Sequence, residues 1–231
     1  MKEECIICKA PLEYLTENEY MECAVCGKKE QSKARCIQGH YVCDECHTNG
    51  MDCVLEICLN EKSKNPVYIL EKMMSMPFCH MHGPEHHVMV GAALAAAYKN
   101  AGGKIQIDKA VCEIYSRGKN VPGGTCGFWG ACGAALSSGI FMSVITNATP
   151  LSVEEWGMSN SLTSKVLGKI GEIGGPRCCK RNSYTAITQT VAFAAEKLGV
   201  QMELDDIVCT RMAQNNQCIG KRCPFNPQNK K

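Results

Sequence analysis

The chain has 231 residues, of which 45% are hydrophobic and 21% charged, so it can bury a core and is not disordered by composition. A net charge of +2 and only 6% aromatic residues argue against a nucleic-acid-binding surface. No apolar run reaches the length of a membrane helix, and the opening MKEECIICKAPLEYL does not read as a signal peptide. We therefore expect a cytoplasmic protein that binds neither nucleic acid nor membrane.

Cysteine is the outlier of the composition, with 18 residues. A secreted disulfide scaffold would be shorter and exported, so in a cytosolic chain these thiols point to metal. Such sulfur content also suits an anaerobic cell. Half of the cysteines lie in short-range pairs before residue 60 and half are scattered after it, on either side of the polar stretch NEKSKNP. We expect a boundary there, with a Cys/His-rich module in residues 1–60 and a second domain in residues 61–231.

The first domain carries four ligand pairs with the spacing of zinc knuckles. Two such pairs complete one closed tetrahedral site, so four pairs predict two zinc ions. A piece this small has little hydrophobic core, and structural zinc contributes about 10–16 kcal/mol to folding in zinc-finger peptides. The predicted ligands are Cys5, Cys8, Cys23, Cys26, Cys36, His40, Cys43 and Cys46.

The spacing leaves the pairing of these ligands open. The run CIQGHYVCDEC (36–46) is typical of RING-like and treble-clef fingers. One interpretation is sequential, with the first two pairs on one ion and the last two on the other. A second is cross-braced, with alternate pairs sharing an ion. A third begins the RING pattern at Cys23 and recruits Cys53 and Cys58. Iron is chemically compatible with the same thiolates.

The second domain is predicted to be mainly α, built from Ala- and Gly-rich helices. Small residues allow close helix packing but leave a core that must be tight or enclose a ligand. The expected helix signals in chain order are the Asn65-Pro66 start, a helix over 86–101 ending at Gly102-Gly103, a cap at Asp108, a helix over 129–146, the capping box Ser152-x2-Glu155, and a helix over 184–198 capped by Ser183 and ended by Gly199.

Four strings in this domain collect the reactive side chains: CHMHGPEHH (79–87), PGGTCGFWGAC (122–132), GGPRCCKR (174–181) and CIGKRCP (218–224). Thiolates with imidazoles suit zinc, iron or an iron–sulfur cluster. The glycines around Cys126 and Cys132 allow the backbone to fold closely around a shared site. Cys178 and Cys179 stand among basic residues that favour thiolates.

These strings predict one site assembled from several loops. Its cofactor-binding residues are predicted to be Cys126, Cys132, Cys178, Cys179, His82, Cys218 and Cys223, around a possible [4Fe–4S] cluster. Catalytic roles are predicted for Cys178, Cys179, Arg177 and His86, with Arg177 stabilising an anion and His86 acting as a ligand or proton donor. Cys79 and Cys112 are expected to be core residues only.

The strings MHGPEHH, VPGGTCGFWGACGAA, ATPLS and GGPRCCKR together resemble an uncharacterised domain family of anaerobic archaea and bacteria, over about residues 64–225. The resemblance implies a shared fold but no established reaction. Some members accompany radical-SAM or methyltransferase-type proteins, which implies iron–sulfur or sulfur chemistry. The piece ACGAALSSG is also similar to a small group of proteins described as redox-active, with a Cys-Gly-Ala helix start.

The leading hypothesis is a cytosolic metalloprotein with a double zinc module and a helical domain for redox, cluster or sulfur-handling chemistry, working with a protein partner. Two alternatives remain open. In one, the protein is an interaction adaptor whose helical domain is only a scaffold. In the other, Cys178 or Cys179 is the nucleophile of a thiol enzyme with His86 as its base.

Overall fold

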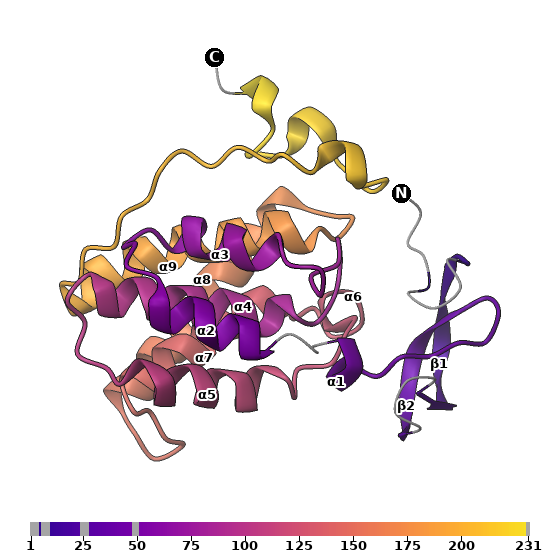
Figure 1. The fold of residues 1–231 in the computed structure, drawn as a ribbon, viewed down its shortest axis with the longest axis horizontal. Helices are drawn as coiled ribbons and strands as arrows, with labels where there is room; N and C mark the ends of the chain where they lie inside the picture. Colours follow the sequence, from indigo (N-terminus) through magenta and orange to yellow (C-terminus); the bar gives the residue numbers. More distant parts are fainter. Residues whose placement is uncertain (1–4, 6–9, 24–27, 48–50, 230–231) are drawn as a thin grey trace.

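The computed structural model describes residue 5 and residues 10–23, 28–47 and 51–229. Its N-terminal part is an antiparallel pair of strands, β1 (Leu12–Glu22) and β2 (Lys29–Cys36). Leu12 pairs with Cys36 and Glu22 with Lys29, and the register shifts between Tyr14 and Glu19. A short helix, α1 (Asp44–His47), follows the pair. This β-hairpin lies beside the helical domain (Figure 1).

The rest of the described chain is helical, which confirms the expected mainly α class. Its helices pack as one bundle, and the chain after the last long helix runs over the bundle as an extended segment with three short 3-10 turns (Figure 1). The elements are α2 (Met51–Asn60), α3 (Pro66–Met74), α4 (His86–Asn100), α5 (Ile107–Gly118), α6 (Thr125–Phe128), α7 (Gly133–Ile145), α8 (Glu154–Ile173), α9 (Cys179–Leu198), η1 (Met212–Gln214), η2 (Gly220–Arg222) and η3 (Pro227–Asn229).

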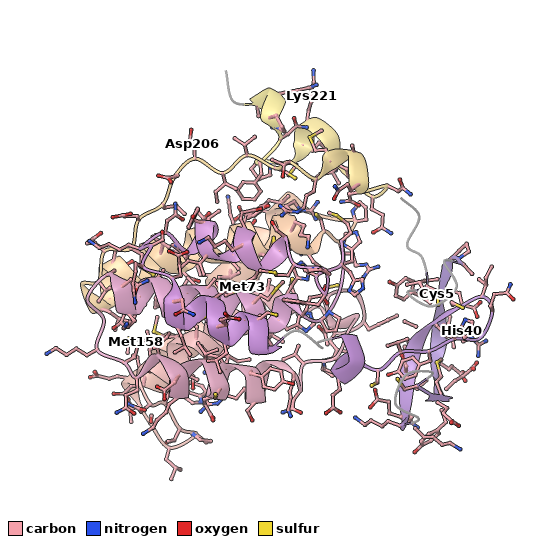
Figure 2. All side chains as sticks on the ribbon, in the orientation of Figure 1. Cys5, His40, Met73, Met158, Asp206 and Lys221 are labelled. Atoms are coloured by element: carbon pink, nitrogen blue, oxygen red, sulfur yellow. The ribbon has the colours of Figure 1, made fainter. Side chains whose placement is uncertain are left out.

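Helix α4 forms the centre of the bundle and is buried on all sides from His86 to Tyr98. It contacts α2, α3, α5, α7 and α9. Its run of alanines lets these neighbours approach closely, as the composition predicted. Met73 of α3 lies in the same core, far from Cys5 and His40 of the hairpin (Figure 2).

Helix α2 packs with the helical domain, although it precedes the expected boundary at residue 60. Val54 and Cys58 are buried in the same core cluster as α4. The Cys58 thiol lies 3.5 Å from the carbonyl oxygen of Ala92, and burial raises its pKa to about 12. Cys53 is exposed on the same helix. The two thiols therefore do not share a site, which disfavours the third zinc interpretation.

Gly118 lets α5 meet α4. A Cβ at this position would lie 2.8 Å from the backbone oxygen of His87, which cannot move without shifting α4. We expect Gly118→Ala to destabilise the fold by about 1–3 kcal/mol, the usual cost of overpacking. Gly168→Ala is the matched control: it lies on an exposed turn of α8 with nothing within 4 Å, and we expect it to stabilise by up to about 1 kcal/mol. Urea unfolding measures the free energy of unfolding of both variants. Equal stabilities of Gly118→Ala and Gly168→Ala would contradict this close packing of α5 on α4.

The helix signals were correct at some ends and wrong at others. Asn65 caps α3 by accepting hydrogen bonds from the N–H groups of Val67 and Tyr68, and Gly199 ends α9 at φ +66°. Ser183 does not cap α9, because this helix begins four residues earlier, at Cys179, with Cys178 as its N-cap. The Cys178 sulfur accepts from the Arg181 N–H and so replaces the expected serine oxygen.

The C-terminal segment is held on the bundle by side chains distant in sequence. Arg211 forms an ion pair of 2.7 Å with Glu71 of α3 and bonds the Tyr184 hydroxyl at 3.2 Å. Phe225 packs edge-on against the Tyr184 ring, with centroids 5.3 Å apart, and its carbonyl oxygen accepts from the Cys209 N–H. These contacts bring the last three cysteines back onto α9.

The hairpin and helix α1 contact two glycine-rich loops of the helical domain. The Asp44 carboxylate accepts from the Gly123 N–H at 3.0 Å, and Arg177 lies over the Tyr14 ring at 5.2 Å and bonds its hydroxyl. No helix among the described residues is long and apolar enough to cross a membrane.

Candidate metal and thiol sites

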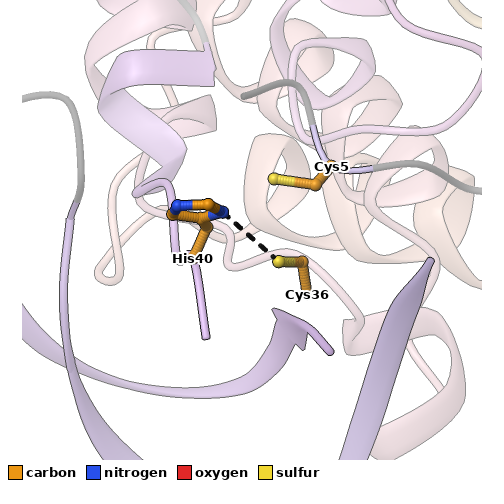
Figure 3. Close-up of side chains that lie close together, drawn as sticks. All are labelled: Cys5, Cys36 and His40. Carbon is orange, nitrogen blue, oxygen red and sulfur yellow. Dashed lines mark hydrogen bonds between the residues drawn. The ribbon is translucent and has the colours of Figure 1, made fainter. Parts of the chain in front are cut away.

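Three side chains of the N-terminal module are arranged as metal ligands. The Sγ atoms of Cys5 and Cys36 and a ring nitrogen of His40 lie within 4.8 Å of one another (Figure 3). Cys36 Sγ is 3.6 Å from His40 Nδ1. A tetrahedral zinc ion holds such a pair roughly 3.5 Å apart, given Zn–S of about 2.3 Å and Zn–N of about 2.0 Å. The group therefore has the dimensions of a metal site.

The turn after β2 shapes this site. Cys36 ends the strand, its N–H bonds the His40 carbonyl, and Gly39 takes the left-handed conformation at φ +82° that closes the turn. The Gln38 N–H donates to Cys36 Sγ at 3.3 Å. Backbone donors of this kind stabilise a thiolate, which is the form that binds metal.

Cys23 and Cys43 also meet in the same module. Cys23 and Cys43 are both buried, and the Cys43 N–H donates to Cys23 Sγ at 3.2 Å. Cys5 of the first predicted pair thus lies with the third pair, Cys36 and His40, and Cys23 of the second pair lies beside Cys43 of the fourth. This is the arrangement of the cross-braced interpretation. Cys8 and Cys26 lie outside the described residues, as does the side chain of Cys46.

Cys178 and Cys179 are adjacent in the chain but contact different residues. Cys178 Sγ accepts from the Arg181 N–H and from Asn215 Nδ2, at 3.4 and 3.5 Å. The Cys179 N–H donates to His82 Nδ1, and His82 Nε2 bonds Asn215 Oδ1 at 3.3 Å. His82 therefore positions Asn215 against Cys178, whereas the sequence had predicted it as a ligand. Burial raises the pKa of the Cys179 thiol.

Four cysteines line one small cavity. They come from the start of α9 and from the C-terminal segment, and they are Cys178, Cys209, Cys218 and Cys223. Sequence reasoning identified three of them and missed Cys209, which carries no short-range partner. Burial raises the pKa of both Cys209 and Cys223.

The guanidinium of Arg181 lies in the wall of this cavity and is 3% exposed. It donates to the carbonyl oxygens of Gly174 and Pro176, at 3.0 and 2.8 Å, and to Asn182 Oδ1 at 3.3 Å. All three acceptors are uncharged, and no carboxylate in the described part of the chain forms an ion pair with it. Since buried charges are normally paired, this cation calls for a nearby anion.

Cys126 and Cys132 line a different, more open cavity of about 570 Å³. Arg181 belongs to both cavities, and Arg177 and Tyr14 line only the second. Of the PRCC string (176–179), Arg177 lines this cavity together with the two thiols of the glycine-rich loop. However, the four thiols Cys126, Cys132, Cys178 and Cys179 do not form one site, because Cys178 faces the first cavity.

A third cluster was not expected, and it involves Cys79. Its sulfur, the Glu85 carboxylate and the His86 ring lie within 4.8 Å of one another, but a charged group already stands among them. Lys180, 2% exposed, donates from Nζ to Cys79 Sγ at 2.9 Å and to His86 Nε2 at 3.0 Å. Its third donor goes to the His80 carbonyl oxygen at 2.7 Å. The ammonium is therefore fully hydrogen-bonded.

His86 is unsuited to the predicted role of general base. Its Nδ1–H donates to the Gly83 carbonyl oxygen at 2.9 Å, and its Nε2 accepts from Lys180. Burial lowers the pKa of His86 to about 3, and the charge of Lys180 acts in the same direction. The imidazole is thus neutral and committed on both nitrogens, and its contacts are with Lys180 and Cys79, not with Cys178.

The fold and the sites together define a class of protein: a cysteine-rich helical domain preceded by a small β-hairpin module. Both parts contain Cys/His groups that could bind a metal ion. The chain belongs to a family of unknown function, DUF5714, whose model matches residues 54–226. Neither the curated proteins nor the solved structures contain a significant match to it. The matched range includes most of α2 and all four cysteines of the first cavity.

Proposed function

We propose that the helical domain binds a [4Fe–4S] cluster through Cys178, Cys209, Cys218 and Cys223, and that the protein is a redox protein of sulfur or electron-transfer chemistry. The observation that carries the proposal is the convergence of these four thiols on one cavity. Four cysteine thiolates are the ligand set of such clusters. In the N-terminal module, we propose two zinc ions in cross-braced sites.

The spread of the four sulfurs favours a cluster over a single ion. A tetrahedral zinc ion with Zn–S of about 2.3 Å holds its sulfurs about 3.8 Å apart. Among the described residues, the groups compact enough for one ion are the Cys5 and Cys79 groups, and the four thiols of the cavity do not form another. Sulfurs that share a cavity at wider spacing fit a multi-iron core.

The charge of Arg181 supports the same occupant. A cluster held by four thiolates carries net negative charge, which would compensate the guanidinium that has no carboxylate partner among the described residues. Burial raises the pKa of Cys223, and the positive charge of Arg181 opposes part of this rise. A purely apolar filling of the cavity would leave this cation unbalanced.

The cavity wall supplies hydrogen bonds to sulfur of the kind that tune a cluster. The Arg181 N–H and Asn215 Nδ2 approach Cys178, and the Gly220 N–H approaches Cys218 at 3.4 Å. Such donors stabilise the reduced cluster and raise its potential. When bound, the group would supply one-electron transfer, and we propose a protein partner in the anaerobic cytoplasm as its donor or acceptor.

Serine variants test the assignment. We expect anaerobically reconstituted wild type to hold iron and sulfide, Cys209→Ser to lose most of both, and Cys112→Ser, which alters an exposed thiol of α5, to keep them. The readouts are iron and acid-labile sulfide content and the visible absorbance of the cluster. Full iron in Cys209→Ser, with loss in Cys126→Ser, would place the cluster in the second cavity and contradict the proposal.

A further inference from the structure

We propose that the turn between Cys218 and Cys223 is the docking surface for a redox protein with an acidic face. This inference rests on the proposed function, because it assigns the electron-transfer partner of the cluster in the first cavity. It is carried by the distribution of charge along the chain, by the exposure of two cationic side chains and by the hydrogen bonds that hold their backbone.

Positive charge is concentrated at the C-terminal end of the chain. Residues 209–231 hold five of the 25 basic residues and none of the 23 acidic ones, so the rest of the chain holds 20 basic and 23 acidic residues. The net charge of +2 is therefore the sum of a basic segment and a slightly acidic remainder. A partner with a negative face is attracted to this segment more than to the rest of the surface.

Two of these cations are exposed and belong to the turn η2. Lys221 and Arg222 form no ion pair with a carboxylate of the described residues, whereas Arg211, in the same segment, is paired with Glu71. Figure 2 shows Lys221 at the outer edge of the C-terminal segment, directed away from the helical bundle. The charges of Lys221 and Arg222 are therefore available to a partner.

The backbone of this turn is held by hydrogen bonds. The side-chain amide of Asn229 donates to the carbonyl oxygens of Lys221 and Cys223, both at 2.9 Å. The Gly220 N–H approaches Cys218 Sγ at 3.4 Å, and the Gly220 carbonyl oxygen accepts from the Cys223 N–H at 3.0 Å. The turn is thus ordered before a partner binds, so that docking costs little conformational entropy.

The same turn joins the exposed cations to the first cavity. Cys218 and Cys223 line this cavity, and Lys221 and Arg222, which lie between them in the sequence, are exposed. The Cys218 thiol is itself only partly buried. A partner held by the two cations would therefore lie against the edge of the cavity, where electrons could pass to a group bound inside it.

The chemistry of the segment favours a protein over a nucleic acid or a membrane. Single-stranded nucleic acids are bound by several cations along the phosphates and by aromatic side chains that stack on the bases. Phe225 is the one aromatic residue of residues 209–231, and it packs against Tyr184. Stable membrane binding needs an apolar anchor besides basic residues, and none of the large apolar side chains of residues 209–229 is exposed.

Isothermal titration calorimetry of the full-length anaerobic chain tests this surface, with a plant-type ferredoxin as the acidic redox protein and cytochrome c as the basic one. We expect ferredoxin to bind more tightly than cytochrome c at about 0.05 M salt, and to lose most of its affinity at about 0.5 M salt. Lys221→Glu combined with Arg222→Glu should weaken ferredoxin binding by about tenfold or more, because it reverses both exposed charges.

The matched control makes the same change of charge elsewhere on the surface. It combines Lys104→Glu with Lys109→Glu, two exposed lysines in and just before α5. Helix α5 and the C-terminal segment lie on opposite sides of the bundle (Figure 1). We expect this control to bind ferredoxin as wild type does.

Three results would overturn the proposal: equal affinities for ferredoxin and cytochrome c, equal affinities of the η2 variant and the α5 control, or tighter binding of an RNA hairpin or of phosphatidylserine vesicles than of ferredoxin. Iron and sulfide content, measured on the same samples, separates a failure of the proposed function. A chain without iron that binds ferredoxin through Lys221 and Arg222 would remove the cluster and keep the docking surface. A chain with iron that gives any of the three results would keep the cluster and remove the surface.

Discussion

Cys36→Ser is expected to unfold the N-terminal module and to release both of the zinc ions proposed for it. The hairpin has a small core, formed among the described residues by Met21, Cys23, Tyr41, Val42 and Cys43. Structural zinc supplies about 10–16 kcal/mol in zinc-finger peptides, so we expect the module to need the two proposed ions in order to fold. Cys36 shares its site with Cys5 and His40, and its loss removes a ligand at the end of β2.

Zinc content and the amide NMR resonances of β1 and β2 measure this effect. Cys53→Ser is the matched control, since its thiol is exposed on α2, and it should keep both ions. The helical domain should retain its far-UV circular dichroism in both variants. A Cys36→Ser chain that binds both ions and keeps the hairpin resonances would disprove the site.

Lys180→Met is expected to lower the free energy of unfolding by about 3–5 kcal/mol, the usual cost of breaking a buried charge pair. The ammonium of Lys180 lies beside Cys79 and His86, and the Glu85 carboxylate belongs to the same cluster. Glu85 is 2% exposed, and one of its oxygens has no hydrogen-bond partner among the described residues. Without the lysine, the buried cluster would lose its ammonium, and the imidazole of His80, 3.7 Å from Glu85 Oε1, would be the main group left to balance this carboxylate.

Denaturant unfolding of anaerobic protein measures this change. Lys169→Met, on the exposed face of α8 with its partner Glu172, should change stability by less than about 0.5 kcal/mol. The double variant Lys180→Met with Glu85→Gln should recover part of the loss, because it removes the unpaired charge. A Lys180→Met chain as stable as the Lys169→Met control would mean that Lys180 does not balance this cluster.

Local signals in the sequence predicted local structure well. The mainly α class, the Asn65 cap of α3 and the Gly199 end of α9 depend on residues close in the chain, and the structure confirms them. The start of α9 was wrong because a cysteine sulfur caps it in place of an oxygen. The hairpin of residues 12–36 was missed, since its outward side chains are mostly charged and its apolar face is short.

The sites depend on contacts that sequence spacing does not encode. Cys209 reaches the first cavity because Phe225 and Arg211 fix the C-terminal segment to α9 and α3. Cys79 and Lys180 are 101 residues apart and meet at 2.9 Å. The sequence predicted that the glycine loop and the PRCC string lie together. It did not predict that Cys178, the N-cap of α9, lines the first cavity while Cys179, the first residue of the helix, lines neither cavity.

The most direct test of a cluster in the first cavity is the content of iron, acid-labile sulfide and zinc in the full chain, purified anaerobically and examined by Mössbauer spectroscopy. The cavity of Cys178, Cys209, Cys218 and Cys223 predicts iron and sulfide in equal amounts, about four of each per chain, with the spectrum of a [4Fe–4S] cluster and about two zinc ions besides. Zinc alone, with neither iron nor sulfide after reconstitution, would contradict it.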